Sequence, residues 1–387
     1  MAKIVIASDK YKGCLSSPEV CETIATGIGK NIPSDWSIEI CPQADGGEGT
    51  VEAVVAALDG EIKTSRVKGP RGDNVEAKWG WIPAEKNPGS DKAAAVIEMA
   101  AASGLALIEE SRQNPMLTTT YGTGEIIREA AREGAGEILL GIGGSATVDG
   151  GLGVVLALGF EVLNESGNPA GEGGQALCSA AKIRDKNVPD CVKNLEIKVA
   201  CDVTNPLLGD EGAARVYGPQ KGADEQMVEE LEKGMGNWAD VVENHSGRRL
   251  RKEPGTGAAG GIGFALMGLL DASLTSGAEL VVELTKLSRR LKDADVLITG
   301  EGALDEQTAY GKTPAVVADE ANRQDVDLVI GLAGAMLPGY RRLYDKFDIL
   351  IGLPRRPMSL EESMGQAKKM LADWGEDIGR IIKKCIR

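Results

Sequence analysis

Short apolar runs alternate along the chain with longer segments in which apolar residues recur every three or four positions. Such runs are typical of strands buried on both faces of a parallel sheet, and such segments are typical of amphipathic helices. The pattern predicts strands at 3–7, 37–41, 93–98, 137–141, 195–200, 295–299, 328–333 and 349–353, and helices at 17–30, 49–58, 123–133, 225–242 and 360–382. Regular alternation of this kind predicts an α/β architecture.

A predicted β-hairpin interrupts the alternation. The strand-like runs 61–68 and 75–82 flank the turn sequence Gly-Pro-Arg-Gly-Asp, which favours antiparallel pairing. We therefore expect two α/β domains. Residues 1–60 and 290–387 would form a doubly wound, Rossmann- or flavodoxin-like domain from both chain ends, with a second α/β domain, residues 61–289, inserted.

Composition and charge narrow the class of protein. The chain carries 43 basic and 58 acidic residues, a net charge of −15, so a nucleic acid or an anionic membrane is not an expected partner. Its 7 cysteines are scattered, which is typical of a reducing compartment. A strand pattern begins at residue 3, so we expect no signal peptide and a cytoplasmic protein.

The single histidine, His245, is predicted to lie in a polar surface loop. A single histidine in such a loop argues against a histidine-rich metal site, a histidine-based triad and most histidine acid–base schemes. Acid–base work would then fall to carboxylates, lysines or water.

Loops rich in Gly, Asp, Lys, Ser and Thr follow several of the predicted strands. In open parallel sheets, ligands bind beyond the carboxyl ends of the strands. These loops are therefore the predicted location of the chemistry, and they span 8–13, 44–50, 141–151, 201–206 and 299–305.

The loop 141–151 has the composition of an anion site. Its glycines, among them Gly143 and Gly144, would let backbone amides approach an anion, and Ser145 and Thr147 add hydroxyl donors. The helix predicted to begin after the loop would add its dipole. A tight strand-to-helix turn is the alternative reading.

Two lysines beside glycines are candidates for anion binding. Lys312 precedes Thr313 and Pro314, which are predicted as N-cap and first residue of a helix, as Ser17 and Pro18 are for the helix at 17–30. Lys221 lies in Gly-Pro-Gln-Lys-Gly and could hold a carboxylate or a phosphate. An exposed lysine and a simple turn are the respective alternatives.

Six acidic residues lie in these glycine-rich loops. Mg²⁺ takes one or two carboxylates plus phosphate oxygens and water, and phosphoryl transfer needs such a metal with cations around the phosphates. Solvated turn residues are the alternative for any single one of the six, which are Asp45, Glu48, Asp149, Asp202, Glu301 and Asp305.

A dinucleotide-type pattern keeps a second class open. Gly141-x-Gly143-x-x-Ala146 follows a predicted strand, and Glu161 lies about 20 residues on, as in nicotinamide-binding enzymes. An NAD(P)-dependent oxidoreductase acting on a small hydroxy acid is therefore the alternative to a kinase. A non-catalytic ligand-binding protein would not need so many converging carboxylates and lysines.

Taken together, the loops resemble the bacterial-type glycerate kinase family, in the branch that makes 2-phosphoglycerate. The resemblance covers nearly the whole chain and is carried by KIVIASDKYKGCLSS, ADGGEGT, GIGGSATVDGG, ACDVTNPLLG, YGPQKGA and VLITGEGALDEQTAYGKTP. It implies ATP and Mg²⁺ as co-substrates, D-glycerate as acceptor, and a cleft between two α/β domains.

Roles for the matched residues follow from chemistry. Asp45 or Asp202 would orient the glycerate hydroxyl, Lys12 and Lys312 would neutralise phosphate or carboxylate oxygens, and Glu301 and Asp305 would hold the metal. The residues predicted to bind substrate or phosphate are Asp9, Lys10, Gly46, Gly47, Glu48, Gly143, Gly144, Ser145, Asp149, Lys221, Lys312 and Thr313.

The chain departs from the family pattern inside these motifs. Family members usually carry Pro, Ser, Asn, Arg and His where this chain has Ser8, Lys10, Val148, Ala303 and Tyr310. A cation is thus lost at position 303 and gained at position 10, so a related hydroxy acid stays open as the acceptor. The choice between 2- and 3-phosphorylation also stays open. The oligomeric state stays open as well, with a homodimer as one option.

Overall fold

The computed structural model describes residues 2–386, and the chain divides into two compact units. Unit 1 comprises the chain up to Asp45, Glu52–Gly60 and the chain from Ala278 onward, and unit 2 comprises Gly46–Val51 and Glu61–Gly277. Strands and helices alternate in both, which confirms the α/β class. The domain limits predicted from the sequence, 1–60 with 290–387 and 61–289, stay a prediction.

Unit 1 is built on a sheet of five parallel strands. Its strand order is β13-β12-β11-β1-β2. Numbered within the unit, this is the flavodoxin-like order 2-1-3-4-5, which reverses between β1 and β11. Ligands are expected where the order reverses. The strands are β1 (Lys3–Ile6), β2 (Ser37–Ile40), β11 (Val296–Leu304), β12 (Leu328–Met336) and β13 (Ile349–Gly352).

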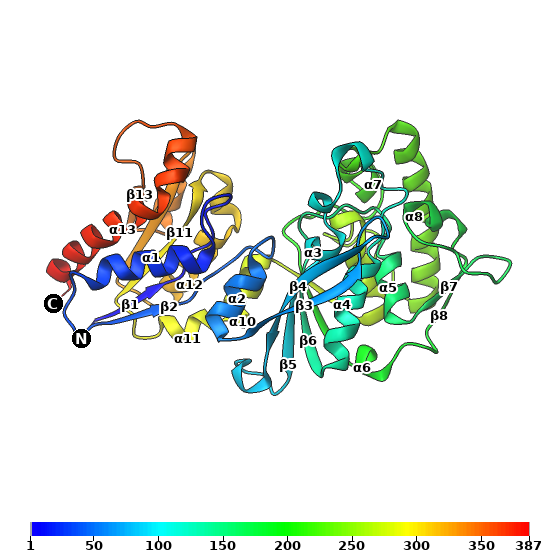
Figure 1. Cartoon of the computed structure of the whole chain (residues 1–387), viewed down its shortest axis with the longest axis horizontal. Helices are drawn as coiled ribbons and strands as arrows, with labels where there is room; N and C mark the ends of the chain where they lie inside the picture. Colours follow the sequence, from blue (N-terminus) through cyan, green and yellow to red (C-terminus); the bar gives the residue numbers. More distant parts are fainter. Residues whose placement is uncertain (1, 387) are drawn as a thin grey trace. The chain divides into compact units, whose positions relative to one another are not determined.

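Helices cover both faces of this sheet (Figure 1). On one face Ile4 and Ile298 pack against α1 (Ser17–Gly29) and α13 (Leu360–Cys385). On the other face a separate cluster, which includes Leu297, joins the strands to the remaining helices. Those helices are α2 (Thr50–Leu58), α10 (Gly277–Leu284), α11 (Leu287–Leu291) and α12 (Thr313–Arg323). The doubly wound arrangement predicted from the sequence is confirmed.

Unit 2 contains a mixed six-stranded sheet of order β10-β9-β6-β5-β4-β3. The predicted hairpin is confirmed, because β3 and β4 pair antiparallel from Glu61 opposite Trp81 to Lys68 opposite Asn74. Strands β5, β6, β9 and β10 run parallel to one another. The strands are β3 (Glu61–Lys68), β4 (Asn74–Ile82), β5 (Ala93–Glu98), β6 (Ala135–Gly141), β9 (Glu196–Ala200) and β10 (Ser273–Thr275), with β7 (Glu161–Leu163) and β8 (Lys182–Arg184) as a separate pair.

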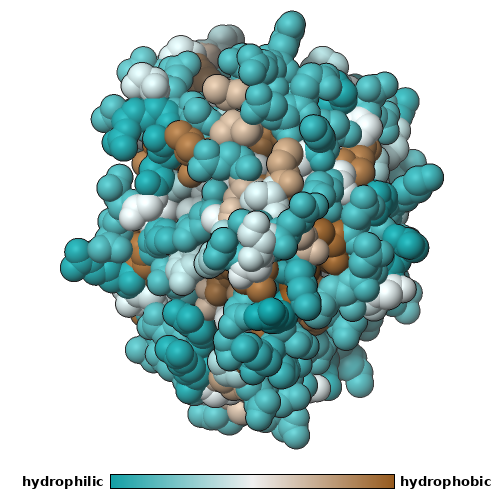
Figure 2. Space-filling view, turned by 90° about the vertical axis from the view of Figure 1, so that its right-hand side faces the viewer, coloured by the Kyte–Doolittle hydropathy of each residue, from teal (hydrophilic) through white to brown (hydrophobic). Residues whose placement is uncertain are grey.

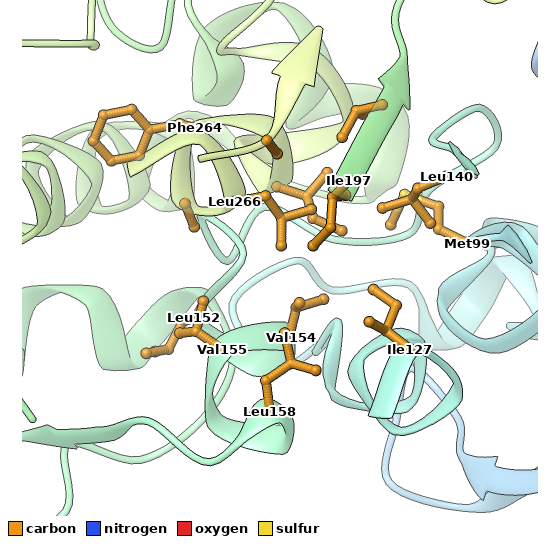
Figure 3. Close-up of a cluster of buried hydrophobic side chains, with 14 of the residues drawn as sticks. Met99, Ile127, Leu140, Leu152, Val154, Val155, Leu158, Ile197, Phe264 and Leu266 are labelled. Atoms are coloured by element: carbon orange, nitrogen blue, oxygen red, sulfur yellow. The ribbon is translucent and has the colours of Figure 1, made fainter. Parts of the chain in front are cut away.

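One large hydrophobic cluster holds unit 2 together. Figure 3 shows side chains of α5, such as Val154 and Leu158, beside Ile127 of α4, with Leu140 and Ile197 of the sheet in the same cluster. These side chains are buried, so the cluster fixes the ends of β6 and β9 from which the loops emerge. The helices of the unit are α3 (Ala100–Ser103), α4 (Tyr121–Arg132), α5 (Leu152–Leu158), α6 (Asp190–Lys193), α7 (Ala213–Tyr217), α8 (Glu225–Ser246) and α9 (Ile262–Leu270).

Four local predictions were wrong. The segment 299–305 was predicted as a loop, but strand β11 continues to Leu304. Helix α1 is capped by Ser16 rather than Ser17, because the Glu19 carboxylate accepts a hydrogen bond from the Ser16 amide at 2.9 Å. Helix α12 is likewise capped one residue earlier, at Lys312 rather than Thr313. His245 is exposed as predicted, but it lies in the last turn of α8 and not in a loop.

Two helical glycines of unit 2 should respond to alanine in opposite directions. A Cβ at Gly124 would lie 2.6 Å from the Val154 carbonyl oxygen, so we expect Gly124→Ala to lower the free energy of unfolding by about 1–3 kcal/mol. Gly236 has nothing within 4 Å of an added Cβ, so Gly236→Ala should raise it by about 0.5–1 kcal/mol. Urea unfolding of both variants measures this, and a stabilised Gly124→Ala would contradict the close α4–α5 approach.

The surface of the chain is mainly polar where it can be viewed. Figure 2 shows a face dominated by hydrophilic side chains, with hydrophobic ones in small groups between them. Among residues 2–386, no helix combines the length and the hydropathy needed to cross a bilayer.

Candidate functional site

A cavity of about 410 Å³ opens in unit 1 at the carboxyl ends of β1 and β11, where the strand order reverses. The loop after β1 contributes Asp9, Lys10, Tyr11 and Lys12 to its lining, and the segment after β2 contributes Asp45. Strand β11 and the start of α12 complete the charged part. The cavity thereby brings together seven residues singled out by the sequence, namely Asp9, Lys10, Lys12, Asp45, Glu301, Asp305 and Lys312.

Two of the carboxylates that line the cavity are costly to ionise. Burial raises the pKa of Asp9 to about 6, although Lys10 and the Thr313 hydroxyl beside it act in the opposite direction. Burial raises the pKa of Glu301 to about 7, against the hydrogen bond that Thr308 Oγ1 donates to Glu301 Oε1 at 2.9 Å. A bound cation would restore both charged forms.

Asp305 is held differently, by donors of the chain itself. Its Oδ1 accepts from the Thr308 amide at 2.8 Å and from Lys312 Nζ at 3.2 Å. Burial alone would raise the pKa of Asp305, but these donors outweigh it and lower the pKa. Asp305 is therefore a charged anchor that positions Lys312 at the start of α12.

Three lysines face the same cavity. Lys10 Nζ lies 3.7 Å from Asp9 Oδ1 and 3.5 Å from Asp45 Oδ1, while Lys12 is exposed at the rim. With Lys312 they place three cations beside the four carboxylates of the lining, which are Asp9, Asp45, Glu301 and Asp305. Such a mixed lining suits a multiply charged anion that binds together with a cation.

The donor set of the cavity fits Mg²⁺. Among residues 2–386, no group of three or more Asp, Glu, Cys or His is placed to hold a metal ion. Mg²⁺ however uses only one or two carboxylates when phosphate and water supply its other oxygens. Asp9 and Glu301, with their raised pKa values, meet that requirement, and the predicted pair Glu301 and Asp305 stays a prediction.

Unit 2 contains a second group of predicted residues, centred on a buried lysine. Lys221 is only 2% exposed, and its Nζ donates to Ser145 Oγ at 2.8 Å and to the Thr147 carbonyl at 2.7 Å. Burial lowers the pKa of Lys221 to about 7, although the charge of Asp149 acts against this. The lysine therefore changes charge near neutral pH while it holds the Ser145 hydroxyl.

A row of free backbone amides adjoins Ser145. The N–H groups of Gly143, Gly144 and Ser145 have no acceptor within the described part of the chain, and both glycines are exposed. Gly144 has a φ of +70°, a conformation that suits glycine and turns successive amides toward one side. The predicted anion site of this loop thus consists of these amides and Ser145.

The N-terminus of the helix after the loop is already filled. Asp149 is fully buried and accepts hydrogen bonds from the amides of Thr120, Gly151 and Gly153 at 2.8, 3.1 and 3.2 Å. Burial raises the pKa of Asp149 and these bonds act against the rise. The α5 dipole is therefore used by the chain's own carboxylate, and a role of Asp149 toward substrate stays a prediction.

The other predicted residues of unit 2 lie at the same edge of its sheet. A Cβ at Gly46 would lie 2.5 Å from Ala200 Cβ, at the end of β9, and one at Gly143 would lie 3.5 Å from Gly47 Cα. Exposed Asp202 follows β9, and its Oδ1 accepts from the Gly277 amide at 2.9 Å. Glu48 is exposed on the segment that follows Gly47.

Some site residues were missed by the sequence reasoning. Thr308 bridges Glu301 and Asp305, and its place three residues after an aspartate in a turn is a readable signal. Tyr11 donates its hydroxyl to the Leu332 carbonyl at 3.0 Å and is buried beneath the loop after β1. Nothing in the sequence pattern distinguishes Tyr11 from a core aromatic residue.

If the cavity takes the ATP that the family resemblance implies, Lys10→Ser should raise the KM for ATP about three- to tenfold, because it removes one cation from the cavity. Ala303 lines the same cavity, so adding Ala303→Arg to Lys10→Ser should recover most of the loss. Steady-state kinetics test this, with Lys30→Ser as a control because Lys30 pairs with Glu376 elsewhere in unit 1. Unchanged KM values for both substrates in Lys10→Ser would remove this role.

Comparisons with known proteins agree with the resemblance in the loops. The family model described as "Glycerate kinase family" matches residues 4–383. A glycerate kinase of Halalkalibacterium halodurans is 44% identical over 98% of both chains, and a glycerate 2-kinase of Escherichia coli K12 is 45% identical over 86% of this chain and 85% of its own. A crystal structure of a Salmonella typhimurium LT2 protein, provisionally named glycerate kinase 2, matches with a TM-score of 0.89 at 39% identity over 99% of both chains.

Proposed function

The chain belongs to the glycerate kinase family, and on that basis we propose that it transfers the γ-phosphoryl group of ATP to the 2-hydroxyl of D-glycerate. The products would be 2-phosphoglycerate and ADP. Phosphoryl transfer leaves the protein mainly with positioning and charge neutralisation, so the charged groups of the chain are the features that matter.

The cavity of unit 1 is the observation that carries this proposal. It gathers three lysines, Lys10, Lys12 and Lys312, around the buried Asp9 and the half-buried Glu301 at the reversal of strand order. Lysines neutralise phosphate oxygens as point charges, and carboxylates of raised pKa need a cation partner. A nucleoside triphosphate with its bound metal ion supplies both the anion and the cation.

Glu301, together with Asp9 or Asp305, would hold Mg²⁺ in this cavity. When bound, the metal neutralises charge on the β- and γ-phosphates. The chain's own contribution is to keep Glu301 oriented through Thr308 and to keep Lys312 in place through Asp305.

The acceptor's carboxylate fits the second group of residues. Free amides at Gly143, Gly144 and Ser145, with Lys221 behind Ser145, match a small carboxylate. Asp202 or Asp45 would orient the hydroxyl and accept its proton, since the chain has no histidine in either group. The prediction that the reaction takes place in a cleft between two domains stays a prediction.

An NAD(P)-dependent oxidoreductase is not favoured. The dinucleotide fingerprint places pyrophosphate at the N-terminus of a helix that follows its glycines directly. Here α5 begins only at Leu152, and Asp149 already accepts its first amides. The match at Gly141-x-Gly143-x-x-Ala146 therefore lacks the geometry that gives the pattern its meaning.

One incubation tests the proposal. The protein is mixed with ATP, Mg²⁺ and D-glycerate, and phosphorus NMR reads the position of the new phosphate. A 2-phosphate supports the proposal, a 3-phosphate corrects the position, and no transfer to glycerate refutes it. Parallel runs with related hydroxy acids test the acceptor, and runs with NAD and NADP followed by absorbance test the oxidoreductase alternative.

A further inference from the structure

Helix α13 presents apolar side chains to the cavity of unit 1 instead of to the core. Leu360, Met364 and Ala367 lie at positions i, i+4 and i+7, on one face of the helix, and all three line the cavity. Leu360 is 75% exposed and Met364 is 37% exposed, whereas Leu371 further along the helix is fully buried. The first turns of α13 thus leave an apolar stripe uncovered.

The floor opposite this stripe is made of very small residues. Gly302 and Ala303 of β11 and Gly334 and Ala335 of β12 all line the cavity, and Ala303 is paired with Ala335 in the sheet. A Cβ at Gly334 would lie 2.6 Å from the Gly302 carbonyl oxygen, so glycine is required there. The cavity lining thus has a second apolar part, made of residues without bulky side chains and accompanied by Leu353.

The apolar end is continuous with the charged end. The Cys14 thiol donates to the Met364 carbonyl at 3.1 Å, and a Cβ at Gly13 would lie 3.2 Å from Met364 Cε. The loop that carries Asp9 and Lys12 therefore contacts the apolar stripe directly. One cavity thus runs from small apolar groups to lysines and carboxylates.

We propose that the apolar end binds the purine base of the nucleotide, between the Leu360–Met364 stripe and the floor of β11 and β12. This rests on the proposed function for the identity of the nucleotide. A flat, weakly polar ring joined to a polyanion has the same polarity as the cavity, whose volume of about 410 Å³ lies in the range of small-molecule sites. Ser363, on the same helix, adds a hydroxyl for a ring nitrogen. The charged end then takes the phosphates.

A ligand that carries the phosphates but lacks the base shows whether the apolar end binds the base or whether only the charges of the ligand matter. The double variant Leu360→Ser/Met364→Ser is titrated by calorimetry with Mg·ATP and with Mg·tripolyphosphate. Because the two large apolar side chains would be buried against the ring, their removal should lower the affinity for ATP about tenfold or more. Tripolyphosphate affinity should not change, because its contacts are with the lysines.

A second variant and a control make the test independent of folding. Ala335→Leu, which fills the floor, should weaken ATP and leave tripolyphosphate unchanged. Ile381→Ser changes an apolar residue of α13 that is 43% exposed and lies outside the cavity, and it should change neither affinity. Melting temperatures show whether each variant is folded.

The outcomes are distinct from those of the proposed function. Unchanged ATP affinity in both cavity variants, or an equal loss for ATP and tripolyphosphate, overturns the base subsite. A wild-type protein that binds ATP no more tightly than tripolyphosphate also overturns it. A protein that shows the base-dependent binding but phosphorylates no glycerate refutes the proposed acceptor and leaves the subsite standing.

Discussion

Glu301→Gln is expected to lower kcat about 10²–10³-fold, the loss seen when one charge-stabilising group is removed from a reaction centre. The side chain keeps its shape and its contact with Thr308, but it loses the charge that would hold the metal. Because Asp9 remains, nucleotide binding should be weakened less than turnover. Steady-state kinetics at saturating Mg²⁺ measure both.

The same variant should be more stable than the wild type at pH 8. The pKa of Glu301 in the folded protein, about 7, lies above the value of ~4.3 in an unfolded chain. Folding then loses stability as the pH rises from ~4 through 7, because the unfolded chain releases this proton more easily. Glutamine removes that loss, so the melting temperature at pH 8 should rise by about 2–4 °C, the shift given by about 1 kcal/mol.

A loss of activity together with a gain in stability distinguishes a residue whose buried carboxylate serves the reaction from a residue that supports the fold. Glu306→Gln is the matched control, because Glu306 is exposed, pairs with Arg342 and does not line the cavity. It should leave turnover unchanged. A Glu301→Gln protein with near-normal kcat would remove Glu301 from the metal site.

Lys221→Met is expected to raise the KM for glycerate about 10²-fold while kcat falls much less. The variant removes the hydrogen bond that Lys221 Nζ donates to Ser145 Oγ and the charge behind the free amides, and a hydrogen bond made by a charged group accounts for about 1.5–3 kcal/mol. Methionine is apolar and similar in length, so the buried position should tolerate it. Kinetics with glycerate as the varied substrate test this.

The pH dependence gives a second readout for Lys221. Its pKa of about 7 in the folded protein means that the wild-type KM for glycerate should rise up to tenfold per pH unit above pH 7, as the charge is lost. The unfolded chain keeps the proton to pH ~10, so stability should rise with pH between 7 and 10. Both slopes should vanish in Lys221→Met.

A control for this pair of results comes from α8. Lys233 is exposed, and Lys233→Met should change neither the KM for glycerate nor its pH profile. A Lys221→Met protein with a normal KM would show that Lys221 supports the loop only.

Much of the charged cavity could be predicted from the sequence because strand ends are informative. Asp9 and Lys12 follow β1 and Glu301 lies among the last four residues of β11, and parallel strands bring such residues to one edge. The hairpin β3–β4 was equally readable, since its turn sequence and length fix the pairing.

The rest depended on contacts distant in sequence. No sequence pattern around Asp149 shows that it accepts a hydrogen bond from the Thr120 amide, 29 residues away. Similarly, no pattern around Lys221 shows that it is buried against Ser145. The N-caps at Ser16 and Lys312 were missed by one residue, because a proline near a helix start is compatible with either position. The apolar stripe that begins at Leu360 was also missed, because its spacing is the same as that of the buried face of an ordinary amphipathic helix.

The pairing of β1 with β11 has a consequence for biosynthesis. Ile4 lies beside Val296, so β1, an inner strand of the unit 1 sheet, obtains one neighbour only after nearly three hundred residues have been made. Residues 61–277 form a contiguous stretch with its own core and can fold while the ribosome is still translating. Until then β1 has one edge without a hydrogen-bonded neighbour. We therefore expect the segment that carries β1 and β2 to bind chaperones in the nascent chain, and the pairing of β1 with β11 to be the slow step of folding.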